Sequence, residues 1–119
     1  MITIAPSDLR ARVQGIFEAL GANESVSKQV AWSLVESNLA GHDSHGVIQI
    51  IAYVDRIRKG QLKPGAKIEV LAESPTTARI NGNWGFGYAV TTRAVEMAVE
   101  KAKANNVAAI SILQQGHIG

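Results

Sequence analysis

The sequence predicts an α+β fold, or a related α/β fold, in which N-terminal helices precede the beginning of a mixed, non-Rossmann sheet domain. Two observations lead to this prediction. Apolar residues recur at helical spacing in the first half of the chain, and short β-branched runs bounded by turn signals follow them. We therefore expect a helical segment over residues 1–65 and the beginning of a sheet domain over residues 66–119.

Three helices are expected in the first segment. Pro6 and Ser7 suit the start of the first helix, and Asn23 or Ser25 is expected to cap the second. Each helix is expected to stop at a glycine, in order Gly21, Gly41 and Gly60. The apolar faces are expected to carry Leu9, Val13, Ile16, Phe17 and Leu20, then Val26, Val30, Leu34, Val35 and Leu39, then Val47, Ile50, Ile51, Val54 and Ile57.

The second segment is expected to hold strands over residues 68–71 and 77–80, a glycine-rich loop over 81–87, and a helix over 88–105. The buried side of that helix is expected to carry Val90, Ala94, Val95, Ala98, Val99 and Ala102. A last strand over residues 107–113 is apolar on both faces, which is typical of a central strand. A sheet that ends on such a strand needs more partners, so we expect the chain to be part of a longer protein or of an assembly.

Composition narrows the function classes. The net charge is +2, the basic residues are scattered, and their one cluster, residues 56–59, falls at an expected helix end, where it meets the helix dipole. With 5% aromatic residues as well, we expect no nucleic-acid partner. The absence of cysteine excludes disulfides and thiolate sites. No apolar run is long enough to span a membrane and no signal peptide is evident, so a cytoplasmic protein without a membrane partner is expected.

All three histidines, His42, His45 and His117, lie in expected loops beside glycines. Imidazole is suited to proton transfer near neutral pH, and glycine lets a ligand approach the backbone. A surface or capping histidine is the alternative, and His45 and His117 are the stronger functional candidates.

The sequence also raises three alternatives to a histidine acid–base site: a metal site, a serine nucleophile and a Rossmann loop. His42, Asp43 and His45 could hold a metal, but they match no zinc signature, so no metal is expected. A Ser44 nucleophile would need a strand–serine–helix elbow, which the sequence lacks. A Rossmann loop beginning at Gly85 would need glycine at position 90, where the chain has Val90.

The histidine motifs resemble one known family. Residues 40–47, Ala-Gly-His-Asp-Ser-His-Gly-Val, resemble the Ser-His-Gly signature of the malate/L-lactate dehydrogenases. Tyr53 followed by Gly60, the glycines of residues 80–87, and residues 106–119 with their Gly-His-Ile-Gly ending resemble further motifs in the same order. The His-Asp-Ser-His-Gly form most resembles the hydroxycarboxylate dehydrogenase B subgroup.

The resemblance implies hydride transfer between NAD or NADP and a 2-hydroxy or 2-oxo acid, in a homodimer with an unusual, non-Rossmann cofactor fold. It implies that His117 is the catalytic acid–base and that His45 lies at the nicotinamide and substrate end. Ser44 is expected to hold the histidine or the cofactor, and the backbone from Gly119 to contact the cofactor.

Two departures from the family pattern stand out. Where many members carry an arginine for the substrate carboxylate, this chain has Gln49, which donates hydrogen bonds but brings no charge. Members also continue well beyond the second histidine, so activity of the 119-residue chain alone is not expected. The alternatives left open are a non-catalytic, partner-binding module and a metal-dependent hydrolase.

Overall fold

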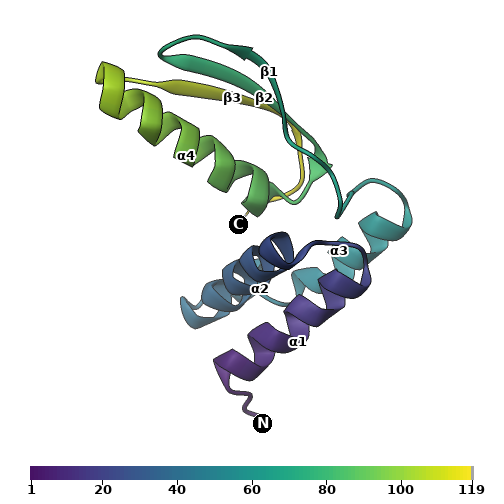
Figure 1. Ribbon diagram of the computed structural model, residues 1–119. Helices are drawn as coiled ribbons and strands as arrows, with labels where there is room; N and C mark the ends of the chain where they lie inside the picture. Colours follow the sequence, from purple (N-terminus) through teal and green to yellow (C-terminus); the bar gives the residue numbers. More distant parts are fainter. Residues whose placement is uncertain (119) are drawn as a thin grey trace. The chain divides into compact units, whose positions relative to one another are not determined.

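The computed structural model describes residues 1–118 and divides them into two compact units, Met1–Gly65 and Ala66–Ile118 (Figure 1). The first unit is helical, and the second combines a three-stranded sheet with one helix. The predicted α+β class and the order of three helices, two strands, a helix and a strand are confirmed.

The first unit contains α1 (Pro6–Ala19), α2 (Glu24–Leu39), a short 3₁₀ turn η1 (Asp43–His45) and α3 (Gln49–Arg58). Pro6 occupies the first turn of α1, where its missing N–H costs no hydrogen bond. Of the two candidate caps of α2, the cap is Asn23, whose side chain accepts a 2.9 Å hydrogen bond from the Val26 amide.

Helices α1 and α2 pack together through fully buried side chains, among them Val13, Phe17, Val30 and Leu34. Polar contacts link the same helices: the buried Ser27 hydroxyl donates to Glu18 at 3.0 Å, and Arg10 pairs with Glu36. On α3 the buried residue is Tyr53, whose ring centroid lies 6.2 Å from that of Phe17.

The expected apolar faces of these helices were too wide. Ile16 and Leu39 are exposed, and Ile51 is 77% exposed. Helical spacing shows which residues share a face, but packing decides how much of that face is covered. The positions at the margin of each stripe therefore remain in contact with solvent.

The second unit contains β1 (Glu69–Glu73), β2 (Thr77–Gly85), α4 (Gly87–Asn105) and β3 (Ala109–Gln115). Strand β2 pairs antiparallel with β1 and parallel with β3, and α4 makes the crossover between the parallel strands. Figure 1 shows α4 lying along one face of this sheet. The core between them consists of Ala78, Ile80, Val90, Ala94 and Met97.

A loop was expected over residues 81–87, but residues 81–85 belong to strand β2, which has an irregularity there, so that prediction was wrong for this part. Asn81 pairs with Leu113 and Gly85 pairs with Gln115. Between these two pairs, β2 advances by four residues while β3 advances by two, so β2 has two extra residues. Asn83 and Trp84 absorb the extra residues by adopting left-handed backbone, with φ of 51° and 61°. The Asn83 side chain ties this bulge to the Lys67 carbonyl at 2.7 Å.

The expected buried side of α4 was partly wrong. Val95 and Val99 are 54% and 46% exposed, and Met97, which was not expected there, is buried. The helix has two neighbouring apolar stripes, and the sheet covers the one containing Val90, Ala94 and Met97. Strand β3, expected to be central, is at the edge of the described sheet.

Among residues 1–118, no helix combines the length and the apolar character needed to cross a membrane.

Candidate functional site

The sequence-predicted site residues fall in both units. In the first unit, Ser44 and His45 lie in η1 between α2 and α3, and Gln49 is the first residue of α3. His117 follows β3 in the second unit. Gly119, predicted to contact the cofactor, lies outside the described residues.

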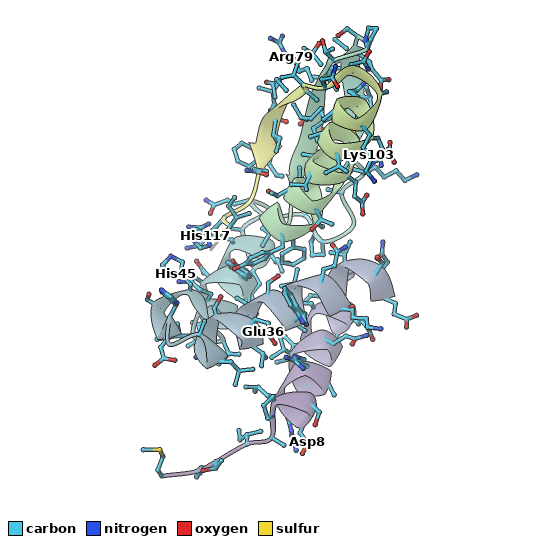
Figure 2. All side chains as sticks on the ribbon, turned by 90° about the vertical axis from the view of Figure 1, so that its left-hand side faces the viewer. Asp8, Glu36, His45, Arg79, Lys103 and His117 are labelled. Atoms are coloured by element: carbon cyan, nitrogen blue, oxygen red, sulfur yellow. The ribbon has the colours of Figure 1, made fainter. Side chains whose placement is uncertain are left out.

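The segment that carries the first histidine, here called the His45 turn (residues 42–47), begins where α2 unwinds at Gly41, which has a φ of 82°. The His42 amide donates to the Ser37 carbonyl at 2.8 Å, and the His45 amide donates to the His42 carbonyl at 2.9 Å. The signature therefore forms a single tight 3₁₀ turn, which Figure 2 shows with His45 labelled.

A residue that the sequence analysis missed, Asn38, contacts both ends of this turn. Its Nδ2 donates to Asp43 Oδ1 at 2.7 Å, and its Oδ1 accepts from the Val47 amide at 2.8 Å. Gly46 is buried, and a Cβ built on it would overlap the Asn38 amide. Nothing in the motif singled out Asn38, because it belongs to the preceding helix.

The candidate chemical groups here are Ser44 and His45 of the turn and Gln49 at the start of α3. Ser44 Oγ lies 2.9 Å from His45 Nδ1, and Gln49 Nε2 donates to the Ser44 carbonyl at 2.7 Å. If the hydroxyl donates, His45 Nε2 carries a hydrogen and is a donor; in the opposite tautomer Nε2 is an acceptor. The Ser44 hydroxyl can serve either tautomer, so this contact orients the exposed His45 ring without fixing its protonated nitrogen.

The second histidine lies in the His117 segment (residues 115–118), labelled in Figure 2. The Gly116 amide donates to the Gly85 carbonyl at 2.8 Å. A Cβ on Gly87 would collide with the carbonyl oxygens of Gly116 and His117 and with the Ile118 side chain. Backbone packing against a glycine thus determines the path of this segment.

The glycines of residues 82–87 allow neighbouring chain segments to pack closely against the backbone. A Cβ on Gly82 would lie 2.8 Å from Val90 Cγ2 and 2.9 Å from the Gln114 carbonyl. Main chain of the His117 segment fills the space beside Gly87 at the start of α4. In a Rossmann unit that position faces the cofactor pyrophosphate. This agrees with the failure of the Rossmann pattern in the sequence.

The acidic and histidine side chains do not form a metal site in the described part of the chain. Within residues 1–118, no group of three or more His, Asp or Glu side chains is arranged to hold a metal ion. His42, Asp43 and His45 are neighbours in sequence, but the Asp43 carboxylate accepts from Asn38.

Comparison with known proteins identifies the family. The model of the malate/L-lactate dehydrogenase family matches residues 4–119. The chain belongs to this family. The motifs of the His45 turn and the His117 segment both lie inside the matched range, so the predicted resemblance is confirmed.

Individual relatives agree with this assignment. Malate/(S)-sulfolactate dehydrogenase of Methanothermus fervidus is 34% identical over 116 residues, which are 98% of this chain and 34% of that protein. Hydroxycarboxylate dehydrogenase B of Escherichia coli O157:H7 is 32% identical over 111 residues, which are 93% of this chain and 31% of that protein. Both kinds of relative match about equally well.

Solved structures give the same result for the fold. Malate dehydrogenase from Pyrococcus horikoshii OT3 superimposes with a TM-score of 0.94 at 33% identity, over 99% of this chain and 34% of that one. Sulfolactate dehydrogenase from Methanocaldococcus jannaschii gives a TM-score of 0.95 at 29% identity, over 99% of this chain and 34% of that one. The chain thus spans about a third of the length of the relatives it matches.

Proposed function

We propose that this chain supplies the two histidine motifs of an NAD(P)-dependent oxidoreductase that interconverts 2-hydroxy acids and 2-oxo acids. The observation that carries the proposal is the Ser44–His45 pair, which lies in the family's signature on a turn held from both ends. Membership of the malate/L-lactate dehydrogenase family supports the reaction class.

The cofactor would be NAD or NADP, and the exposed groups of the His45 turn fit a polar ligand of this kind. When bound, the reduced nicotinamide supplies a hydride to C2 of a 2-oxo acid. Ser44 and His45 offer a hydroxyl and a ring nitrogen for hydrogen bonds to cofactor and substrate. Gly119, which lies outside the described residues, is proposed to contact the cofactor through its backbone.

His117 is proposed as the catalytic acid–base. Its imidazole would hold a proton and deliver it to the C2 oxygen during reduction, and would take it back during oxidation. The glycine contact at position 87 supports this role, because it confines the main chain that carries the ring. His45 is proposed as the second catalytic histidine, oriented by the Ser44 hydroxyl.

Gln49 is proposed to contact the substrate carboxylate. One of its two amide hydrogens is used by the Ser44 carbonyl, so the side chain can donate one further hydrogen bond and accept others. Because it carries no charge, it would bind that carboxylate less strongly than an arginine would. Changing Gln49→Arg should therefore reorder the preferred acids.

The activity is proposed for a full-length enzyme in which the remaining two thirds of the family's length are present. The half-exposed apolar side chains of Val95 and Val99 on α4 and of Leu113 on β3 support this, because such surface is usually covered by further structure. A homodimer and a cytoplasmic location are part of the same proposal.

The deciding experiment measures oxidation of NADH and of NADPH by the full-length enzyme with the 2-oxo acids of lactate, malate and sulfolactate. His117→Ala should lower kcat/KM by about 10² to 10⁴-fold. His42→Ala is the matched control and should change it little, since His42 has no assigned role. Unchanged reduction by His117→Ala would remove the acid–base assignment. Cofactor binding without turnover in the unaltered enzyme would favour a non-catalytic module.

A further inference from the structure

We infer that Asn38 is a positioning residue for His45, an inference that rests on the proposed function of the His45 turn. The side-chain amide of Asn38 connects Asp43, the first residue of η1, with Val47, just beyond it. His45 lies between these two anchored positions. Asn38 touches neither cofactor nor substrate in this role and acts through the turn.

The turn needs such a contact because its own backbone holds it weakly. Its internal backbone hydrogen bonds are the short 3₁₀ bonds from His45 to His42 (2.9 Å) and from Gly46 to Asp43 (3.1 Å), and bonds to Ser37 and Gln49 join it to the flanking helices. A single 3₁₀ turn has poor hydrogen-bond geometry and gains little stability from its own bonds. The two Asn38 bonds, at 2.7 and 2.8 Å, close the turn against the end of α2.

The orientation of the Asn38 amide follows from its partners. The Val47 N–H can only donate, so it requires the Asn38 oxygen. The ionised Asp43 carboxylate can only accept, so it requires the Asn38 nitrogen. An asparagine satisfies both at once, whereas an aspartate at position 38 would oppose a second carboxylate.

Gly46 completes the arrangement. It is buried, and any Cβ at this position would overlap the Asn38 oxygen, carbon and nitrogen. The glycine of the Ser-His-Gly motif therefore leaves room for Asn38, and the two residues form a matched pair. Since Gly46 directly follows His45, a displaced Asn38 would alter the backbone that aims the imidazole.

The test exchanges the side-chain amide of Asn38 and the carboxylate of Asp43, which are hydrogen-bonded to each other. In Asn38→Asp the facing carboxylates repel each other, whereas in Asp43→Asn the new amide oxygen can still accept from Asn38. The double variant Asn38→Asp/Asp43→Asn restores both bonds: the new amide at position 43 donates to the new carboxylate at position 38, and that carboxylate still accepts from the Val47 amide. Asn38→Leu keeps a similar shape without hydrogen bonds. Ser37→Ala is the control, because it removes a bond to the Ser33 carbonyl at the same helix end without touching the turn.

Two measurements on the full-length protein report the turn without any substrate. These are amide hydrogen exchange of residues 42–49 and the ¹⁵N shifts of the His45 ring, which report its tautomer. Asn38→Leu and Asn38→Asp should accelerate exchange at Val47 by about tenfold and change the tautomer populations. Asp43→Asn and the double variant should stay within about threefold of the unaltered protein. Unchanged exchange and shifts in Asn38→Leu would overturn the inference.

Activity then separates a positioning role from a purely structural one. In NADH-dependent reduction of a 2-oxo acid, Asn38→Leu should lower kcat by more than about tenfold while KM changes less, with recovery in the double variant. If the turn loosens and kcat stays unchanged, the positioning role is wrong even though the enzyme is as proposed. If the unaltered protein shows no reduction of any 2-oxo acid, the proposed function fails, and exchange and ring shifts still decide whether Asn38 orients His45.

Discussion

The two units hold their histidines in contrasting ways. The His45 turn is fastened by side-chain hydrogen bonds from Asn38 and Gln49. The His117 segment is fastened by main chain, through the Gly116–Gly85 hydrogen bond and the close approach at Gly87. Side-chain contacts can give way by rotation, whereas backbone contacts in a packed unit yield only when the surrounding structure moves. The same change, glycine to alanine, should therefore cost more in the second unit than in the first.

The largest effect is expected at Gly87. In Gly87→Ala the new Cβ meets carbonyl oxygens of the His117 segment, so the segment or α4 must shift. Unfolding free energy should fall by about 3 kcal/mol, and 2-oxo acid reduction should fall at least about tenfold. Urea unfolding and steady-state kinetics measure both.

A glycine-to-alanine substitution without neighbours checks that the lost unfolding free energy of Gly87→Ala comes from the contact of the new Cβ. Gly15 lies within α1, and nothing is within 4 Å of a Cβ built on it. Gly15→Ala should therefore raise the unfolding free energy by about 0.5–1 kcal/mol, because alanine favours the helix. Equal destabilisation by both substitutions would contradict the contact argument.

A smaller effect is expected at Gly46. The Cβ of Gly46→Ala meets the side chain of Asn38, which can rotate away at the loss of its two hydrogen bonds. The cost should be about 1–2 kcal/mol, below that of Gly87→Ala. In Asn38→Ala, where those bonds are already absent, adding Gly46→Ala should cost nearly nothing more. Fully additive costs in denaturant unfolding would show that the two residues are independent.

Gln49 allows stability and specificity to be separated. Gln49→Leu loses the bond to the Ser44 carbonyl and should cost about 1 kcal/mol in urea unfolding. Gln49→Arg should change the order in which the full-length enzyme prefers 2-oxo acids. If the unaltered enzyme and Gln49→Arg rank the 2-oxo acids in the same order of kcat/KM, Gln49 does not set specificity.

The smallest effect is expected far from both histidines in sequence, at Glu73. The hydrogen bond and charge of Lys101 lower the pKa of Glu73 from its ordinary value of 4.5. A carboxyl with a lowered folded pKa stabilises above its unfolded pKa, and that contribution disappears as the pH falls through the folded value. Glu73→Gln should thus be slightly less stable than the unaltered protein at pH 7 and equal to it in strong acid. If the unfolding midpoints of Glu73→Gln and of the unaltered protein still differ in strong acid, the ion pair is not the cause of the difference.

Several features could be read from the sequence because they depend on local chemistry. Asn23 caps α2 through its own side chain, Pro6 begins α1, and the basic residues Arg56 and Arg58 fall in the last turn of α3. The motif residues around Ser44 and His45 were found because serine, histidine and glycine in one short loop have a recognisable pattern. Each of these features involves residues within a few positions of one another.

Other features depended on contacts between distant positions. Val95 and Val99 share a helix with Val90 and Ala94, and helical spacing alone could not say which stripe meets the sheet. The glycines around Gly82 were expected to form a loop, but pairing with β3 draws them into β2. Asn38 has no motif of its own and acquires its role only when the turn folds back on α2.

By itself, the sequence determined the order and type of the elements, the family and the chemical groups available. These follow from periodicity, capping and short motifs, all of which act over a few residues. Only the tertiary structure decided which apolar stripe of α4 is buried and how each histidine is held. Those outcomes depend on which distant atoms compete for the same space, as Asn38 and Gly46 do in one unit and Gly87 and Gly116 do in the other.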